Sequence, residues 1–370
     1  FEGWGERRSP LMDYDLAWRA ADEGSVEKVW QWSESERHAV YRAICPSCGK
    51  EAVDNHHAGY QASKLFSPWQ KDKPSDIAKK YIDAKGDPDK EQAWWNTQMG
   101  LPHRPNHGKQ LPVDVLLARR EIFPAVVPDG VALLTAGVDT QDDRFEITIT
   151  GWGRDEESWS VAHDVIYGDL ETEEPWKRLD AYLKQIWRRG DGRGLNIMAT
   201  CMDSGGHHTQ KVYEFAKERL GRRVWAIKGE SAQGGKRNPV WPTKRPSSKS
   251  KASFRPVILG VNSAKDVIRG RLHLEPPKPG AAAAGYMHFP DDRDLGYFNQ
   301  LLAERLVYKV ISGQRYSIWE AIPGRANEAL DCLVYSYAAL CGLKHMGLKL
   351  NVRAANLEAD PDKFLPAPVG

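Results

Sequence analysis

The stretch Leu133–Gly153, LLTAGVDTQDDRFEITITGWG, constrains the fold more than any other part of this sequence. An apolar run typical of a buried strand ends on an acid, Asp139, and the polar turn TQDD follows it. Residues 144–152 then alternate between apolar and polar side chains, as a strand with two different faces does. Two strands joined by a short polar turn predict a hairpin, with a carboxylate left where a core strand ends.

The surrounding pattern predicts an α/β domain built on that hairpin. Strands are expected at 131–139, 144–152 and 158–167, and the short turns between them make an antiparallel meander. Helical and strand patterns then follow at 173–190, 195–203, 208–221, 223–229, 285–290, 293–307 and 326–342. A meander followed by alternating helices and strands predicts a mixed sheet with helices on its faces.

Three regions are expected along the chain. Residues 1–128 form a connecting region of helices and loops, and the proline-rich segment Phe123–Gly130 marks its end. Residues 129–343 form the main domain. Residues 344–370 lack a core pattern and are expected to be a flexible C-terminal tail.

The composition is that of an ordinary globular protein, with 41% hydrophobic and 28% charged residues. No apolar run approaches the roughly 20 residues that a membrane helix needs, so no membrane contact is expected. Five cysteines, an odd number, favour reduced thiols in a cytoplasm over a disulfide framework. Because the first residue is Phe1, we expect the chain to begin inside a longer protein.

Two further acids repeat the situation of Asp139. Asp203 ends the apolar strand LNIMATCMD, and ligands of open α/β sheets collect where strands end. Asp331 heads an otherwise apolar helix face that includes Val334 and Ala338. Three carboxylates brought together repel one another, and Mg²⁺ or Mn²⁺ would relieve that repulsion. We therefore expect Asp139, Asp203 and Asp331 to be catalytic and to hold two such ions for phosphodiester hydrolysis.

Simpler roles remain open for each acid taken alone. An Asp that closes a strand is often a turn or capping residue, and an Asp in a helix is often solvated or paired with a cation. Asp142, Asp143 and Glu328 lie near the three acids in sequence, but a hairpin turn and a helix first turn account for them.

These features resemble a known family. The segments AGVDTQDDRFEITITGWG, HFP and NEALDCLVYSYAAL resemble the nuclease domain of the large terminase subunit of lambda-type tailed bacteriophages. LFSPW and WWNTQMG resemble the family's segment between ATPase and nuclease, so the resemblance covers roughly residues 59–342. It implies a ribonuclease-H-like mixed sheet with flanking helices and a small helical or irregular N-terminal connecting segment.

The resemblance also implies a function and partners. The family packages viral DNA: an ATPase drives translocation, and the nuclease cuts the concatemeric genome into unit lengths. This chain, without the ATPase, would cut double-stranded DNA using Asp139, Asp203 and Asp331 as metal ligands. The expected partners are double-stranded DNA, the small terminase subunit, the portal or procapsid and the ATPase domain. The expected location is the host cytoplasm, transiently on the procapsid.

A structural zinc site at Cys45 and Cys48 is a weaker hypothesis. The family's connecting region often carries two Cys-x-x-Cys pairs, and only one is present here. A closed zinc site needs four ligands, and His56 and His57 are adjacent residues that rarely complete one tetrahedron. A second pair could instead lie upstream of Phe1.

Residues 229–256 are expected to form a long mobile loop with a basic character. Between Lys228 and Pro256, eight Lys or Arg stand against one Glu. Such a segment beside an acidic site would contact DNA phosphates without sequence preference, although a solvated insertion is the simpler interpretation. The candidate DNA-binding residues are Lys236, Arg237, Lys244 and Arg245.

Two other functions remain open from the residues. A transposase, integrase or junction resolvase also uses an acidic triad in this fold, and strand transfer or selective junction cutting would distinguish it. A non-enzymatic docking module of the packaging motor would use its acids as turns and salt bridges. Divalent ions would then leave its melting temperature unchanged.

Overall fold

The structure is a computed structural model that describes residues 30–33, 38–41, 63–67, 72–85, 88–101, 111–230, 237–243, 255–278, 283–311 and 314–361. The chain divides into two compact units, Phe1–Gln61 and Ala62–Gly370. In the first unit, the described residues form an antiparallel hairpin of β1 (Trp30–Ser33) and β2 (His38–Tyr41). All other described elements belong to the second unit.

The boundary between the units therefore lies near residue 61 and not near residue 128, where the proline-rich segment predicted it. The physical reason is that residues before that segment take part in the main unit. Helix α4 (Val113–Leu117) packs against α8 (Leu295–Leu301), and β3 (Arg120–Glu121) pairs with β12 (Met287–Pro290). The shorter elements before them are η3 (Lys64–Phe66), α2 (Pro74–Ala84), α3 (Pro88–Trp94) and the π-helical turn η4 (Trp95–Met99).

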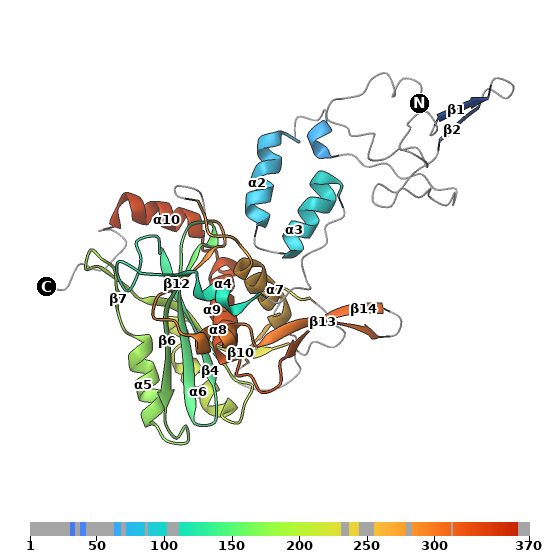
Figure 1. Cartoon of the computed structure of the whole chain (residues 1–370). Coiled ribbons are helices and arrows are strands. Elements are labelled where there is room, and N and C mark those ends of the chain that lie inside the picture. The colour runs from blue at the N-terminus through green and yellow to red at the C-terminus, as the bar shows by residue number, and fades with distance from the viewer. Residues whose placement is uncertain are drawn as a thin grey trace. The chain divides into compact units, whose positions relative to one another are not determined.

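An eight-stranded sheet forms the centre of the second unit, in the order β11-β10-β9-β4-β5-β6-β12-β3 (Figure 1). The antiparallel meander predicted from the sequence is confirmed, and every other neighbouring pair in this sheet is parallel. The strands not yet given are β4 (Leu133–Thr140), β5 (Arg144–Trp152), β6 (Ser158–Tyr167), β9 (Ile197–Asp203), β10 (Val224–Gly229) and β11 (Val257–Leu259). The mixed sheet expected of a ribonuclease-H-like domain is thus present.

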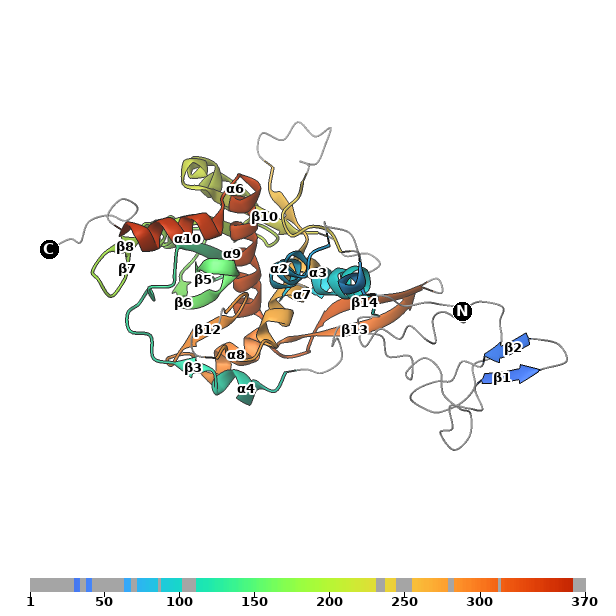
Figure 2. The same ribbon diagram turned by 90° about the horizontal axis from the view of Figure 1, so that it is seen from above.

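Helices cover both faces of this sheet. On one face, α5 (Glu174–Leu183) and α6 (Thr209–Glu218) share a buried core with β4 and β5. On the other face, α9 (Glu328–His345) packs directly on β4, β5 and β9, and both α8 and α7 (Val261–Leu272) lie against α9 (Figure 2). Successive side chains of a strand point to opposite faces, so Asp139 shares the α9 face with Thr135 and Gly137.

Helix α9 approaches β4 so closely that a side chain is excluded at one position. A Cβ atom on Gly137 would lie 1.8 Å from the carbonyl oxygen of Cys332 and 2.6 Å from the backbone nitrogen of Ser336. Hydrogen bonds hold this contact: Thr135 Oγ1 donates to the Ser336 carbonyl at 2.8 Å, and Cys332 Sγ donates to the Glu146 carbonyl at 3.1 Å. The same contact brings the first turn of α9 over the ends of β4 and β9.

Several elements differ from the sequence prediction. The helix expected over 173–190 ends at Leu183, and β7 (Trp187–Arg188) pairs with β8 (Gly194–Leu195) beyond it. The amphipathic segment at 293–307 is helical only as α8. An antiparallel hairpin of β13 (Glu304–Ile311) and β14 (Gln314–Ala321) follows and projects from the domain (Figures 1 and 2). Apolar residues continue from α8 into β13, so their pattern in the sequence does not show where the helix ends and the strand begins.

The expected flexible tail is wrong for its first half. Residues 350–359 form α10 (Leu350–Ala359), which buries Leu350, Ala354 and Leu357. Their spacing of four and three residues puts them on one helix face, a pattern too short and sparse to stand out in the sequence. Among the residues that the structure describes, no helix is long and apolar enough to cross a membrane.

We expect Gly137→Ala to lower the free energy of unfolding by about 3 kcal/mol, because backbone atoms of α9 would have to move to admit the methyl group. Gly221→Ala is the matched control, since a Cβ there meets nothing within 4 Å and should change stability by less than about 1 kcal/mol. Urea unfolding of both variants measures the difference. Equal stability of the two would contradict the close contact of α9 with β4.

Candidate functional site

The three predicted acids converge at the carboxyl ends of two neighbouring strands. The register pairs Val138 of β4 with Met202 of β9, so Asp139 and Asp203 are the next residues of two parallel strands. Asp331 lies in the first turn of α9, which packs on both strands. The sequence therefore placed these acids correctly on their elements, and the fold brings the elements together.

Asp139 carries a strongly perturbed carboxyl group. Burial raises the pKa of Asp139 to about 7, and the residue is only 6% exposed. A hydrogen bond from Gln141 Nε2 to Asp139 Oδ2 opposes that rise. The negative charges of Asp331, Asp203 and Glu328 raise the pKa further, so these carboxylates lie close enough to influence one another.

Burial also raises the pKa of Asp203 and of Asp331. Asp203 Oδ2 accepts a hydrogen bond from the Gly205 backbone nitrogen at 3.0 Å, which opposes the rise. Asp331 Oδ1 lies 3.1 Å from the ammonium of Lys265, which opposes the rise there. In each case desolvation outweighs the stabilising contacts, so the site holds negative charge that its surroundings do not fully compensate.

Two more glutamates join this end of the sheet through one arginine. Arg144 Nε lies 2.8 Å from Glu146 Oε1, and Arg144 Nη2 lies 3.2 Å from Glu328 Oε1. Glu146 pairs with Asp139 in the β4–β5 register and is 5% exposed. Glu146 is not among the site residues predicted from the sequence, although the register of the predicted hairpin places it opposite Asp139.

The chemistry of these donors fits a divalent cation. All of them are carboxylate oxygens, which Mg²⁺ and Mn²⁺ prefer. In the described part of the chain, however, no three His, Cys, Asp or Glu side chains stand close enough together to hold an ion as they are. Gln141 and Lys265 engage the oxygens of Asp139 and Asp331, and the carboxylates would have to turn toward a shared ion.

The other residues considered from the sequence fall into three groups. Asp142 and Asp143 are exposed turn residues: Asp142 pairs with His207 at 2.8 Å and Asp143 with Arg144 at 3.0 Å. Arg237 donates to the Asp266 carboxylate and, at 3.0 Å, to the Ser317 carbonyl, which ties it to α7 and β14. Lys236, Lys244 and Arg245, and both cysteines of the possible zinc site, Cys45 and Cys48, lie outside the described residues.

An antiparallel meander flanked by parallel strands, with acids ending β4 and β9 and a third on α9, defines a ribonuclease-H-like domain. More specifically, residues 57–354 match the family model for the endonuclease domain of the terminase large subunit gpA. The chain belongs to this family, as its sequence motifs predicted.

Two curated relatives agree with this assignment. The chain is 35% identical over 309 residues to the terminase large subunit of Escherichia phage lambda. It is 33% identical over 305 residues to that of Enterobacteria phage P21. Each alignment covers 81% of this chain and 46% of the relative, so the chain spans about half the length of these relatives.

The raised pKa of Asp139 predicts a pH-dependent cost to stability in metal-free buffer with EDTA. Because the folded state holds the proton more tightly than the unfolded state, stability falls as the pH rises from about 4 to about 7. Asp139→Asn removes this cost and should be more stable above pH 7, by up to about 4 kcal/mol. Urea unfolding of both proteins from pH 4 to pH 8 tests this. A constant difference across that range would contradict the perturbed carboxyl group.

Proposed function

We propose that this chain is a divalent-metal-dependent endonuclease that cuts double-stranded, concatemeric viral DNA during genome packaging. The observation that carries the proposal is the convergence of Asp139, which is buried, with the half-buried Asp203 and Asp331, in a chain of the terminase endonuclease family. Desolvated carboxylates cost stability, and acids with pKa values raised in this way cluster at functional sites.

In this proposal, Asp139, Asp203 and Asp331 hold Mg²⁺ or Mn²⁺, with two ions expected. Such ions supply a nucleophilic water and stabilise the leaving oxygen of the phosphodiester. Gln141 orients the Asp139 carboxylate by its hydrogen bond, and Arg144 holds Glu146 and Glu328 beside it. These contacts hold the acids in the metal-free protein, and the Asp139 carboxylate would turn from Gln141 toward an ion that binds.

DNA contact has to come from outside the acidic site, because its carboxylates repel phosphates. We propose this role for Lys236, Lys244 and Arg245 of the basic segment. Arg237 is already engaged by Asp266 and Ser317, and its guanidinium supports the fold around α7 and β14.

The proposed partners rest on the family to which the chain belongs. We propose that the chain acts with an ATPase domain, the small terminase subunit and the portal in the host cytoplasm. A structural zinc at Cys45 and Cys48 would need ligands beyond this pair.

We expect the purified chain to nick and linearise plasmid DNA with Mg²⁺ or Mn²⁺ and to be inactive in EDTA. Asp139→Asn should reduce cleavage by at least about a thousandfold, which corresponds to about 4 kcal/mol of lost transition-state stabilisation. Asp191→Asn is the matched control. Asp191 precedes the start of β9, whereas Asp203 is the last residue of that strand. Normal cleavage by Asp139→Asn would remove the basis of the proposal.

The basic segment makes a separate prediction about DNA affinity in EDTA. Lys244→Ala combined with Arg245→Ala should lower the slope of log affinity against log salt by about 2, since each phosphate contact contributes about 0.9. Fluorescence anisotropy with a labelled duplex across a NaCl series measures this. Lys177→Ala combined with Lys217→Ala, on exposed positions of α5 and α6, should leave the slope unchanged. An unchanged slope in the first variant would exclude these two residues as phosphate contacts.

A further inference from the structure

A buried lysine contacts one of the three site acids from outside the site. Lys265 lies in α7, and its side chain is 9% exposed. Its Nζ lies 3.1 Å from Asp331 Oδ1 and 2.5 Å from Glu304 Oε1. Glu304 is the first residue of β13, so one ammonium joins α7, α9 and the root of the projecting hairpin.

Asn327 closes this arrangement into a ring. Its Nδ2 donates to Glu304 Oε1 and to Asp331 Oδ2, both at 3.0 Å. Both oxygens of Asp331 are therefore engaged, one by a neutral amide and one by an ammonium. Within these described contacts, two carboxylates share a single positive charge.

The Lys265 ammonium has two carboxylate partners in this ring, Glu304 and Asp331. Glu304 is 7% exposed, so the ammonium is held in an environment with little access to water. A cation paired with Asp331 competes with a metal ion for the negative charge of that carboxylate.

We infer that Lys265 is a positioning residue that holds Asp331 before metal binds and then releases it while staying paired with Glu304, which leaves Asp331 to the ion. The inference rests on the proposed function, in which Asp331 is a metal ligand. Glu304 acts through Lys265 and holds no ion itself. The hairpin β13–β14 carries Glu304 and is thereby coupled to the site.

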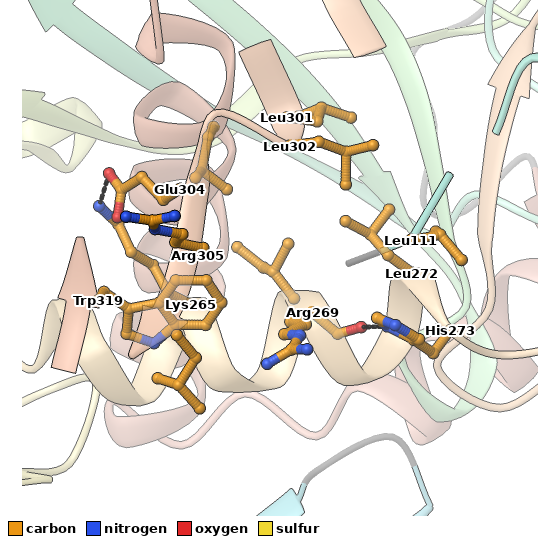
Figure 3. A pocket seen from close by; sticks show the side chains of 13 residues that line it. Leu111, Lys265, Arg269, Leu272, His273, Leu301, Leu302, Glu304, Arg305 and Trp319 are labelled. Atoms are coloured by element: carbon orange, nitrogen blue, oxygen red, sulfur yellow. Dashed lines mark hydrogen bonds and ion pairs between the residues drawn. The ribbon is translucent and has the colours of Figure 1, made fainter. Parts of the chain in front are cut away.

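A cavity beside Lys265 gives its ammonium room to move away from Asp331. Lys265 and Glu304 both line a cavity of about 160 Å³ between α7, the end of α8 and the hairpin (Figure 3). That volume admits several water molecules. An ammonium that leaves Asp331 thus remains paired with Glu304 and can gain water, so no buried charge is left without a partner.

Two neutral substitutions should change Mn²⁺ affinity in opposite directions. Lys265→Met removes the competing cation, and the half-saturating Mn²⁺ concentration should fall about tenfold, equivalent to about 1.4 kcal/mol. Glu304→Gln removes the alternative partner and leaves the ammonium on Asp331, so half-saturation should rise about tenfold. Isothermal titration calorimetry of the metal-free chain with Mn²⁺ measures both without DNA cleavage. A purely structural role for the ring predicts no such opposition.

The double variant separates an indirect role of Glu304 from direct metal binding. If Glu304 acts through Lys265, adding Glu304→Gln to Lys265→Met should leave Mn²⁺ affinity close to that of Lys265→Met alone. If Glu304 binds the metal, the added substitution weakens affinity as much as it does in the wild type, and the inference fails. Lys265→Met leaves the carboxylates of Glu304 and Asp331 without their ammonium partner. The double variant replaces one of them, Glu304, by a neutral amide and is therefore less prone to misfold.

A surface ion pair provides the control. Lys177 and Glu173 form an exposed pair at 2.8 Å beside α5, and Lys177→Met and Glu173→Gln should leave Mn²⁺ affinity unchanged. If the wild type neither binds Mn²⁺ nor cuts DNA, the proposed function fails and this inference fails with it. If the wild type binds Mn²⁺ but Lys265→Met binds it more weakly or equally, only the inference is overturned.

Discussion

The close contact of α9 with β4 is the interaction on which the site depends. At Gly137 the helix backbone lies where a side chain would otherwise be, and the Thr135 hydroxyl ties the same strand to Ser336. Two residues beyond Gly137 the strand carries Asp139, and one residue before Cys332 the helix carries Asp331. A small residue in the strand therefore sets the approach of two carboxylates that are almost two hundred positions apart in sequence.

Incomplete charge compensation is the second property of this end of the sheet. Arg144 forms ion pairs with Glu146 and Glu328, and Lys265 forms ion pairs with Glu304 and Asp331. Among the described residues, these acids therefore outnumber the cations that contact them. Desolvation raises the pKa of all three site acids despite those contacts. Such an arrangement costs stability in the metal-free protein, and the same excess of negative charge would attract a divalent ion.

The contacts of Lys265 and Arg237 connect the acidic site to elements outside the sheet. Helix α7 carries both Lys265 and Asp266: the first reaches Glu304 and Asp331, and the second holds Arg237 and Trp319. The basic segment, the projecting hairpin and the acidic site are thus joined at one turn of one helix.

Local pattern in the sequence determined the meander, the strand that ends at Asp203, and the positions of Asp139, Asp203 and Asp331 on their elements, because alternation and strand ends depend on nearby residues. Tertiary structure alone decided that Glu304 joins the site region, that Lys265 holds Asp331, and that Arg237 pairs with Asp266. It also decided that α10 packs as a helix in the expected tail. Periodicity reports which face of an element is buried, whereas charge pairing depends on partners that only folding brings within a few ångströms.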